Sequence, residues 1–318
     1  MTKINLRGHS LRSAYGLLLL KKLEEFDFLV ASCDTSTSAG LEKLKRRDGN
    51  RYLEFGISEQ AAVTISAVLA SQGSRVFFST FAPFLTYRAA EMIKLSVSYD
   101  NSPVCMVGIA AGLVQSHLGG THCSLEDQAL FSSFGNIDIY SPGDFFELES
   151  AIDSYLKEPR PIYIRLSGDS KIYSGPKNEV CSGMSRVIQG KEVALVFSGA
   201  ILSQAPSVDE YLRVKGKNFS HYSLHTVNSE NFSAIAQILV QYEQVFFIEE
   251  HSFIGSQFFR IKERMDDFKG SHLGPQGSYS MLGSKYQEAL KMFGLGAKEI
   301  AARVESYTNP TLFKGRPS

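Results

Sequence analysis

The sequence predicts an α/β protein of two doubly wound domains, in which parallel strands are covered by helices on both faces. Apolar runs of strand length alternate with helical patterns along most of the 318-residue chain. These runs are apolar throughout rather than at every second position, which is typical of strands buried on both faces. The alternation stops near residues 176–190 and then resumes. Each half of the chain is long enough to bury a core of its own.

The first domain is expected at residues 1–175. Its strands are predicted at 26–34, 74–80, 102–111, 136–142 and 160–168, and its helices near 8–24, 58–72, 82–99, 126–133 and 144–157. A further strand-like run lies at residues 52–55, where Tyr, Leu and Phe favour extended backbone until Gly56 interrupts them. Apolar residues then recur at helical spacing, and Ser58 precedes them as a candidate N-cap.

A linker is expected at residues 176–190, because this segment is polar and rich in glycine and lacks sustained periodicity. The second, smaller domain is expected at residues 191–318. Its strands are predicted at 192–200, 219–227 and 244–252, and its helices near 202–213, 230–241, 284–293 and 297–305.

Composition argues against several classes of function. Lysine plus arginine and aspartate plus glutamate both number 33, so no net charge favours nucleic acid or an anionic membrane. The four cysteines are widely spaced, which is typical of reduced thiols rather than of disulfides or a zinc site. The N-terminal segment lacks an apolar signal core, and the run from Leu17 to Leu20 is too short to span a membrane. A soluble, cytoplasmic protein is expected.

Candidate functional residues are sought where strands end, because open parallel sheets bind ligands at the carboxyl ends of their strands. The candidates that follow the predicted strands are Asp34, Ser38, Glu59, Phe81, Phe84, Tyr87, His117, His122, Glu126 and Asp127. These residues also have ordinary structural interpretations. An acid in the first turn of a helix interacts favourably with the helix dipole, by about 0.3 to 1 kcal/mol. The three aromatic residues could form a buried helix face, and His122 could bond within its own loop.

Three segments of the first domain carry a family resemblance. They are "RYLEFGISEQAAVTISAVLASQG", "FFSTFAPFLTYRAAEMIKLS" and "GGTHCSLEDQALFSSFGNIDIYSPGDFFELESAI". In this order they closely resemble the pyrimidine-binding domain of the transketolase family of thiamine-diphosphate enzymes. The later segments "VALVFSGA" and "VFFIEEHSFIGS" resemble the C-terminal domain of the same family. The resemblance extends over nearly the whole chain, from Arg7 to Val304.

The resemblance implies a role for Glu59. The matching acid of the family bonds a ring nitrogen of the cofactor's aminopyrimidine and promotes the tautomer that deprotonates the thiazolium carbon. An apolar, aromatic-walled site would desolvate such a carboxylate, which favours its sharing a proton with the ring. The resemblance places further residues in the cofactor pocket: Asp34, Phe81, Phe84 and Tyr87. Among them, Phe84 would stack on the aminopyrimidine.

The resemblance also implies contacts with substrate. His122 matches a histidine that contacts the donor's hydroxyls or oxyanion, so Glu59 and His122 are the implied catalytic residues. Arg7 and Ser38 match positions that hold the acceptor's phosphate. His117 could add a further polar contact, or it could be an exposed loop residue.

Three polar residues of the family pattern are replaced in this chain. An arginine falls on Gly168, an aspartate on Leu118 and a histidine on Ala110. The lost arginine alone would remove charge-assisted bonds of about 1.5 to 3 kcal/mol each. A simple pentose phosphate is therefore not the expected substrate.

The diphosphate-binding half of the family pattern is expected on another chain. Family members hold the diphosphate through Mg²⁺ with a G-D-G motif followed by asparagines, and Gly143-Asp144 is the nearest approach here, where the family has a helix-capping residue. We therefore expect no metal ligands on this chain. An N-terminal transketolase subunit would supply the diphosphate and Mg²⁺ sites, and two copies of each chain would form an α2β2 heterotetramer.

The expected function is that of the C-terminal subunit of a split transketolase-like transferase, which moves a two-carbon ketol or acyl unit to an aldehyde or ketone acceptor. Two alternatives stay open. The beta subunit of a 2-oxo-acid dehydrogenase decarboxylase shares the domain order and a G-G-x-H loop, although "THCSLED" and "STFAPFLTYRAAEMIK" are nearer the transketolase pattern. A non-catalytic subunit that only scaffolds a companion chain would not need Glu59, Phe84 and His122 together.

Overall fold

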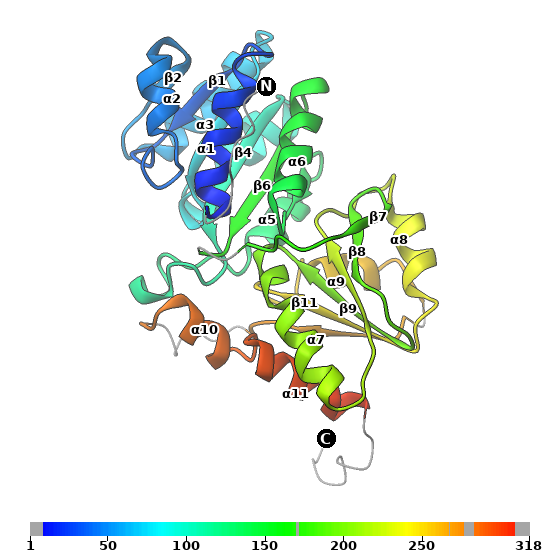
Figure 1. Ribbon diagram of the computed structural model, residues 1–318. Coiled ribbons are helices and arrows are strands. Elements are labelled where there is room, and N and C mark those ends of the chain that lie inside the picture. The colour runs from blue at the N-terminus through cyan, green and yellow to red at the C-terminus, as the bar shows by residue number, and fades with distance from the viewer. Residues whose placement is uncertain (1–8, 170–171, 267, 277–282, 309–318) are drawn as a thin grey trace.

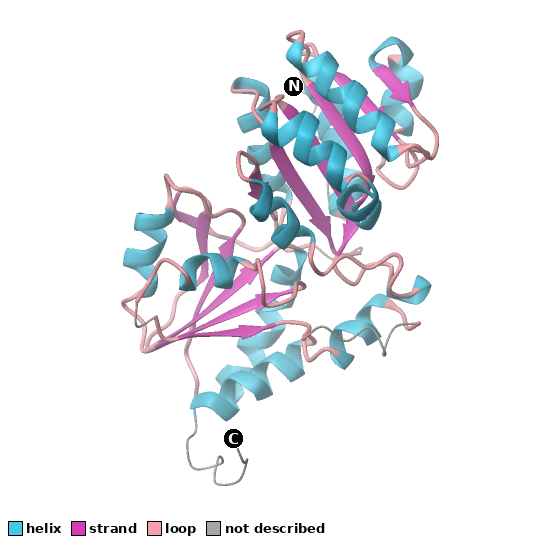
Figure 2. Cartoon of the chain, turned by 180° about the vertical axis from the view of Figure 1, so that it is seen from behind, coloured by secondary structure: helices cyan, strands magenta, loops and turns pink. Residues whose placement is uncertain are grey.

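The structure is a computed structural model of the chain and describes residues 9–169, 172–266, 268–276 and 283–308. It contains two six-stranded sheets, one in each half of the chain. Figure 1 shows the N-terminal sheet above the C-terminal one, and Figure 2 shows both from behind. Helices pack on the two faces of each sheet. The predicted fold class, α/β with two domains, is confirmed. Arg7 lies outside the described residues.

The first sheet is entirely parallel, with the strand order β2-β1-β3-β4-β6-β5. Its strands are β1 (Leu29–Ser32), β2 (Tyr52–Glu54), β3 (Val76–Phe81), β4 (Val104–Ala111), β5 (Asp138–Tyr140) and β6 (Ile162–Ser167). The chain runs outward from β1 to β2 and then returns to β3 on the other side of β1. Open α/β sheets usually bind ligands at such a reversal, beyond the carboxyl ends of the strands.

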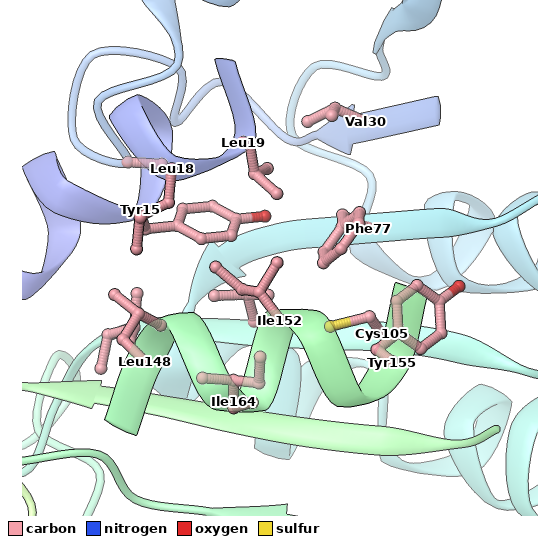
Figure 3. Close-up of a cluster of buried hydrophobic side chains, with 14 of the residues drawn as sticks. Tyr15, Leu18, Leu19, Val30, Phe77, Cys105, Leu148, Ile152, Tyr155 and Ile164 are labelled. Carbon is pink, nitrogen blue, oxygen red and sulfur yellow. The ribbon is translucent and has the colours of Figure 1, made fainter. Parts of the chain in front are cut away.

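Helices cover both faces of this sheet because successive residues of a strand point to opposite sides. Phe77 packs with α1 and α6 in the core that Figure 3 shows. Its neighbour Phe78 packs in the opposite core, with α3, α5 and the helical segment 84–99. The helices and 3-10 turns of this half are α1 (Leu11–Lys22), α2 (Glu42–Arg47), η1 (Gly49–Arg51), α3 (Glu59–Ser71), η4 (Ser116–Leu118), α5 (Asp127–Phe134) and α6 (Phe145–Lys157).

The helix predicted at 82–99 contains two wide turns. η2 (Phe84–Arg88) and η3 (Ile93–Tyr99) are π-helical, and the short α4 (Ala90–Met92) separates them. At the end of η2 the N–H of Ala89 donates to the carbonyl of Phe84, five residues earlier, at 3.3 Å. The hydrophobic pattern does not distinguish α from π turns, so the sequence predicted only an ordinary helix. π turns inside helices occur frequently at functional sites.

The start of α6 explains the near match to a G-D-G motif. Asp144 is the N-cap of α6, and its Oδ1 accepts a hydrogen bond from the N–H of Glu147 at 2.9 Å. Lys177 forms ion pairs with both carboxylates, each at 2.7 Å. Asp144 is therefore a capping residue, as the sequence indicates.

The second sheet has the order β12-β11-β9-β10-β8-β7, and its first four strands are parallel. Those strands are β9 (Val193–Ser198), β10 (Ser220–Leu224), β11 (Gln244–Glu249) and β12 (Gly270–Leu273). One face carries η5 (Ala200–Gln204), α7 (Ala205–Val214), α10 (Tyr286–Met292) and α11 (Ala297–Thr308), and the other carries α8 (Phe232–Leu239) and α9 (Gln257–Lys262).

The segment 176–190, where a linker is expected, contains two further strands of this sheet. β7 (Asn178–Cys181) and β8 (Met184–Ile188) form an antiparallel hairpin, and β8 pairs with β10. Gly183 in the turn has a φ of +83°, which favours glycine. The hairpin lies at the sheet edge and most of its side chains stay partly exposed, so no apolar run marks it in the sequence. The domain boundaries at 175 and 191 remain predictions.

No helix in the described ranges is long and apolar enough to cross a membrane. All four cysteines are free, and Cys33, Cys105 and Cys123 are buried.

Candidate active site

The candidate residues follow four neighbouring strands of the first sheet. Asp34 follows β1, Glu59 begins α3 after β2, Phe84 follows β3 and His122 lies in the loop after β4. These strands are adjacent and parallel, so their carboxyl ends lie at one edge of the sheet. The fold therefore brings to one edge four segments that are far apart in the sequence.

Glu59 is a buried carboxylate at the N-terminus of α3. Only 1% of its side chain is exposed, and its Oε2 accepts a hydrogen bond from Arg88 at 2.7 Å. The guanidinium of Arg88 lies over the ring of Phe84, 4.4 Å from the ring centroid, and 41% of the Arg88 side chain is exposed. Burial of an isolated carboxylate is costly, and the pairing with Arg88 offsets that cost. An acid placed only for the helix dipole would gain nothing from such burial.

Three rings form an aromatic cluster beside this ion pair. The ring of Phe84 meets Phe81 and His122 edge to face, at centroid distances of 6.0 and 5.2 Å. Phe81 and His122 are 6.5 Å apart. The Nδ1 of His122 is hydrogen-bonded to the hydroxyl of Thr121 at 2.9 Å. The structure therefore brings together Glu59, Phe81, Phe84 and His122, as the sequence analysis expects.

Tyr87 extends the cluster toward the His122 loop. Its hydroxyl donates to the carboxylate of Glu126, and 48% of the residue is exposed. Phe81 and Phe84 are only partly buried. The three aromatic residues are therefore not the buried helix face that the periodicity alone allowed.

Glu54 joins two of the segments that surround Glu59. Its Oε1 accepts from the N–H of Asp34 at 2.8 Å and from the N–H of Gly56 at 3.2 Å. Asp34 is exposed and has a φ of +52°. Ser58 occupies the N-cap position of α3, but its hydroxyl donates to the carbonyl of Phe55 at 2.7 Å and does not cap the helix. Glu54 was not predictable from the sequence, because a glutamate at a strand end carries no distinctive signal.

Cys33 is close enough to Glu59 for the two to interact electrostatically. Burial raises the pKa of the Cys33 thiol to about 11, and the charges of Glu59 and Glu54 contribute to the increase. A thiol with this pKa is protonated at neutral pH and is a poor nucleophile. Cys33 therefore lies near Glu59 without being a nucleophile at neutral pH.

Other predicted residues are not brought to the cluster. No hydrogen bond or ring contact within the described ranges joins it to Ser38, in the loop after β1, or to His117, which is exposed in η4. Arg7 lies outside those ranges.

The loop that carries His122 is anchored in the second half of the chain. The N–H of Leu113 donates to Oε2 of Glu250 at 3.3 Å, and the N–H of Ser252 donates to the carbonyl of Leu125 at 2.8 Å. Glu250 in turn accepts from the hydroxyl of Tyr286 at 2.6 Å. Residues of both domains therefore hold this loop in position.

A buried ion pair reinforces the same junction. Nε of Arg165 lies 2.8 Å from Oδ2 of Asp127, and neither side chain is more than 1% exposed. Arg165 also donates to the carbonyls of Glu250 and Ser124, at 2.8 and 3.2 Å. Tyr163 donates to the same oxygen of Asp127 at 2.7 Å. Asp127, a candidate at the sheet edge, is thus part of the domain junction.

Two departures from the family pattern are fixed by the backbone. Gly168 has a φ of +78°, and a Cβ added there would lie 2.4 Å from the Cβ of Ala200. Ala110 is fully buried with a φ of +54°, at the irregularity between β4 and β6. Neither position can take a large polar side chain without local rearrangement. Leu118, the third departure, is 50% exposed.

Three surface hollows elsewhere in the described chain do not resemble this cluster. One lies beside α7 and α11, one around Phe253 and His272, and one along α6. Across the described ranges, no group of three or more His, Cys, Asp or Glu side chains could hold a metal ion.

A known protein family and solved structures are similar to this chain. Residues 8–170 match the family model described as transketolase, pyrimidine binding domain. The chain belongs to this family. The matched segment contains the whole first sheet and the cluster around Glu59.

Similar curated proteins include transketolase subunits of matching length. The chain is 26% identical to the 6-deoxy-6-sulfo-D-fructose transketolase subunit SqwH of Clostridium sp. (strain MSTE9), over 98% of each chain. It is also 26% identical to a subunit of the apulose-4-phosphate transketolase of Phocaeicola vulgatus, over 73% of this chain and 75% of that protein.

Solved structures show the same fold. The chain superposes with a TM-score of 0.81 on a split gene transketolase described as an inactive beta4 tetramer, at 24% identity, over 94% of this chain and 98% of that one. The transketolase of Campylobacter jejuni gives a TM-score of 0.77 at 18% identity, and this chain covers 48% of its length.

Proposed function

We propose that this chain is the pyrimidine-domain subunit of a split, thiamine-diphosphate-dependent transketolase-like enzyme that is active only with a partner chain. The observation that carries the proposal is the buried carboxylate of Glu59 at the N-terminus of α3, which is joined through Arg88 to the ring of Phe84. Membership of the pyrimidine-binding family and the subunit names of the relatives support it.

The residues at this edge fit the aminopyrimidine of the cofactor. A flat heteroaromatic ring needs an aromatic face for stacking and a carboxylate for its ring nitrogen. Phe84 offers the first and Glu59 the second, and the planar cation of Arg88 contacts both at once. When bound, the cofactor supplies the electron sink for breaking and forming a carbon–carbon bond beside a carbonyl.

Glu59 would hold a proton at the ring nitrogen. The low exposure of its carboxylate keeps water away, which strengthens its hydrogen bonds and favours exchange of the proton with the ring. Phe81 and Tyr87 would form the pocket wall, and Asp34 would line the same cavity.

His122 would act on the substrate. One ring nitrogen is engaged by Thr121, so the other is left to donate to a hydroxyl or a developing oxyanion of the donor. Arg7 and Ser38 would contact the acceptor, and His117 would add a polar contact with the substrate.

The proposed partner is an N-terminal transketolase subunit that carries the diphosphate and Mg²⁺ sites. Exposed apolar side chains cluster on and around α3 and the segment 84–99: Ile57, Ile65, Val68, Tyr87, Leu95 and Tyr99. Apolar surface of this kind is typical of protein interfaces. Because this surface adjoins Glu59, the partner would complete the active site. We propose two copies of each chain, an α2β2 heterotetramer, in the cytoplasm.

The proposed substrate is a small sugar or keto compound other than a simple pentose phosphate. The backbone at Gly168 leaves no room for the phosphate-binding arginine of the family pattern. Two relatives are named for less common sugars, a sulfofructose and apulose 4-phosphate. Xylulose 5-phosphate with ribose 5-phosphate should therefore be turned over poorly, which a coupled assay measures. Turnover as efficient as that of ordinary transketolases would contradict the substrate proposal.

Calorimetry tests the split arrangement. The purified chain alone should bind thiamine diphosphate negligibly with or without Mg²⁺, and addition of the N-terminal subunit should create a strong, Mg²⁺-dependent site. Tight binding by this chain alone would contradict the proposal.

Activity assays of the reconstituted pair separate the alternatives. Ketol transfer is expected, whereas reductive acylation of a lipoyl group would favour a 2-oxo-acid dehydrogenase. A pair whose activity is unchanged when Glu59 is replaced would make this chain a scaffold.

A further inference from the structure

Arg88 occupies the position that the proposed function gives to the aminopyrimidine. Its guanidinium donates to Glu59 at 2.7 Å and lies over the ring of Phe84 at 4.4 Å. These are the two contacts assigned to the cofactor's ring, a bond to the carboxylate and a stack on the phenylalanine. A guanidinium is planar and delocalised and has N–H donors along its edge, so it satisfies the same two groups as a flat, N-protonated heterocycle.

We propose that Arg88 closes the pyrimidine pocket of the free chain and that the cofactor's ring must displace it. The inference rests on the proposed function, because it takes Glu59 and Phe84 as the pyrimidine site. Phe81 and His122 contact the ring of Phe84 edge to face, and Arg88 lies over the face of that ring. A pyrimidine that uses this face of Phe84 and bonds Glu59 must therefore displace Arg88, which makes both contacts at once.

Arg88 is the member of the ion pair that moves. Its side chain is 41% exposed, so its charge can return to water when the bond to Glu59 breaks. Glu59 is 1% exposed and lies in the first turn of α3, which fixes its backbone. Displacement therefore rotates a surface side chain and leaves the helix in place.

The closure also explains how the free chain tolerates Glu59. A carboxylate kept ready for a ring nitrogen would be buried without a partner until the cofactor arrives, and an uncompensated buried charge is destabilising. Arg88 provides the compensating charge in the interval. The consequence is a lower apparent affinity, because only the fraction of molecules with Arg88 displaced can bind the ring.

The test uses the purified full-length chain and two probes that need no diphosphate site, 4-amino-2-methylpyrimidine and thiamine. Ligand-observed NMR titrations compare the wild type with Arg88→Ala and Arg88→Lys. We expect Arg88→Ala to bind both probes about 10- to 100-fold more tightly than the wild type, the range of a lost charge-assisted competitor. Arg88→Lys should be intermediate, since an ammonium keeps the charge without the plane.

A matched control and a competition complete the experiment. Arg264 lies over the ring of Phe232 at 5.3 Å in the second domain, so Arg264→Ala removes a similar arginine–phenylalanine contact and should bind the probes as the wild type does. Millimolar methylguanidine should compete with the pyrimidine for Arg88→Ala.

Equal or weaker binding by Arg88→Ala, binding by neither protein, or a lack of competition by methylguanidine would overturn the closure. Failure of the proposed function is distinguishable. A reconstituted pair that lacks transferase activity, with the gain in Arg88→Ala intact, would refute the function and leave the closure standing.

Discussion

The buried pair Arg165–Asp127 gives the sharpest stability prediction. Replacing Arg165 by Met removes the cation but leaves Asp127 fully buried. The nearby His251 is already engaged, because its Nε2 accepts from the N–H of Gln128 at 3.1 Å. Tyr163 is the hydrogen-bond donor that remains.

Breaking a buried ion pair by removing one partner costs about 3 to 5 kcal/mol. At about 1.5 °C per kcal/mol for a chain of 318 residues, Arg165→Met should lower the melting temperature by about 4 to 8 °C, measured by differential scanning calorimetry. Because Arg165 also bonds the carbonyl of Glu250, the two domains should lose stability together.

Arg160→Met is the matched control. Its Nε lies 2.8 Å from Oδ2 of Asp138, the same distance as in the buried pair, but the two side chains are 29% and 30% exposed. The loss should be about 1 kcal/mol or less. In the double variant Arg165→Met, Asp127→Asn the stranded charge is gone, and part of the lost stability should return. Equal losses in Arg165→Met and Arg160→Met would refute the argument that burial sets the cost.

Three further predictions concern the site, a glycine and pH. Glu59→Gln should lower turnover of the reconstituted enzyme by about 10²- to 10⁴-fold. The free energy of unfolding should change by less than about 1 kcal/mol, because the partner Arg88 is half-exposed. Turnover within tenfold of the wild type would contradict the assigned role. Gly168→Ala should destabilise the protein by about 1 to 3 kcal/mol more than Gly73→Ala, measured by urea unfolding. Both glycines have a positive φ, but of the two only Gly168 would place its new Cβ against another atom, the Cβ of Ala200 at 2.4 Å. Equal losses would show that this contact relaxes freely. Burial lowers the pKa of His251 in the folded protein from 6.5 to about 4, although the carboxylate of Asp127 is nearby. The contribution of neutral His251 to stability is therefore present above pH 6.5 and is lost as the pH falls from there through about 4. Between pH 7 and pH 5 the urea midpoint of His251→Gln should fall less than that of the wild type.

The arrangement of the first sheet was predictable because its strands are buried on both faces and therefore read as continuous apolar runs. The same regularity located Glu59, Phe84 and His122, since each follows such a run and parallel strands end at one edge. Glu59 was uncertain from the sequence alone, because a first-turn acid suits the helix dipole whether or not it is buried.

Other features had no local signal. The hairpin β7–β8 is a partly exposed sheet edge, so its pattern resembles a polar linker. Arg88 is a half-exposed arginine on a helical segment, a position at which charged residues are ordinarily solvated. Its partner is 29 residues away. Arg165 and Asp127 are 38 residues apart in the sequence, and only the packing of β6 against α5 brings them together.

The π turn η2 has an evolutionary consequence. A π turn encloses one residue more than an α turn, so insertion of a single residue into an ordinary helix would produce it. Relatives with an ordinary helix here should align with a one-residue gap between Phe84 and Ala89. In those relatives the side chains after the gap would be rotated by about 100° relative to the phenylalanine, as each α-helical residue turns the chain by that angle. An arginine could then reach the acid at the start of α3 only from a different position in the sequence. A one-residue gap in this turn would thus distinguish family members that keep the arginine over the aromatic ring from those that do not.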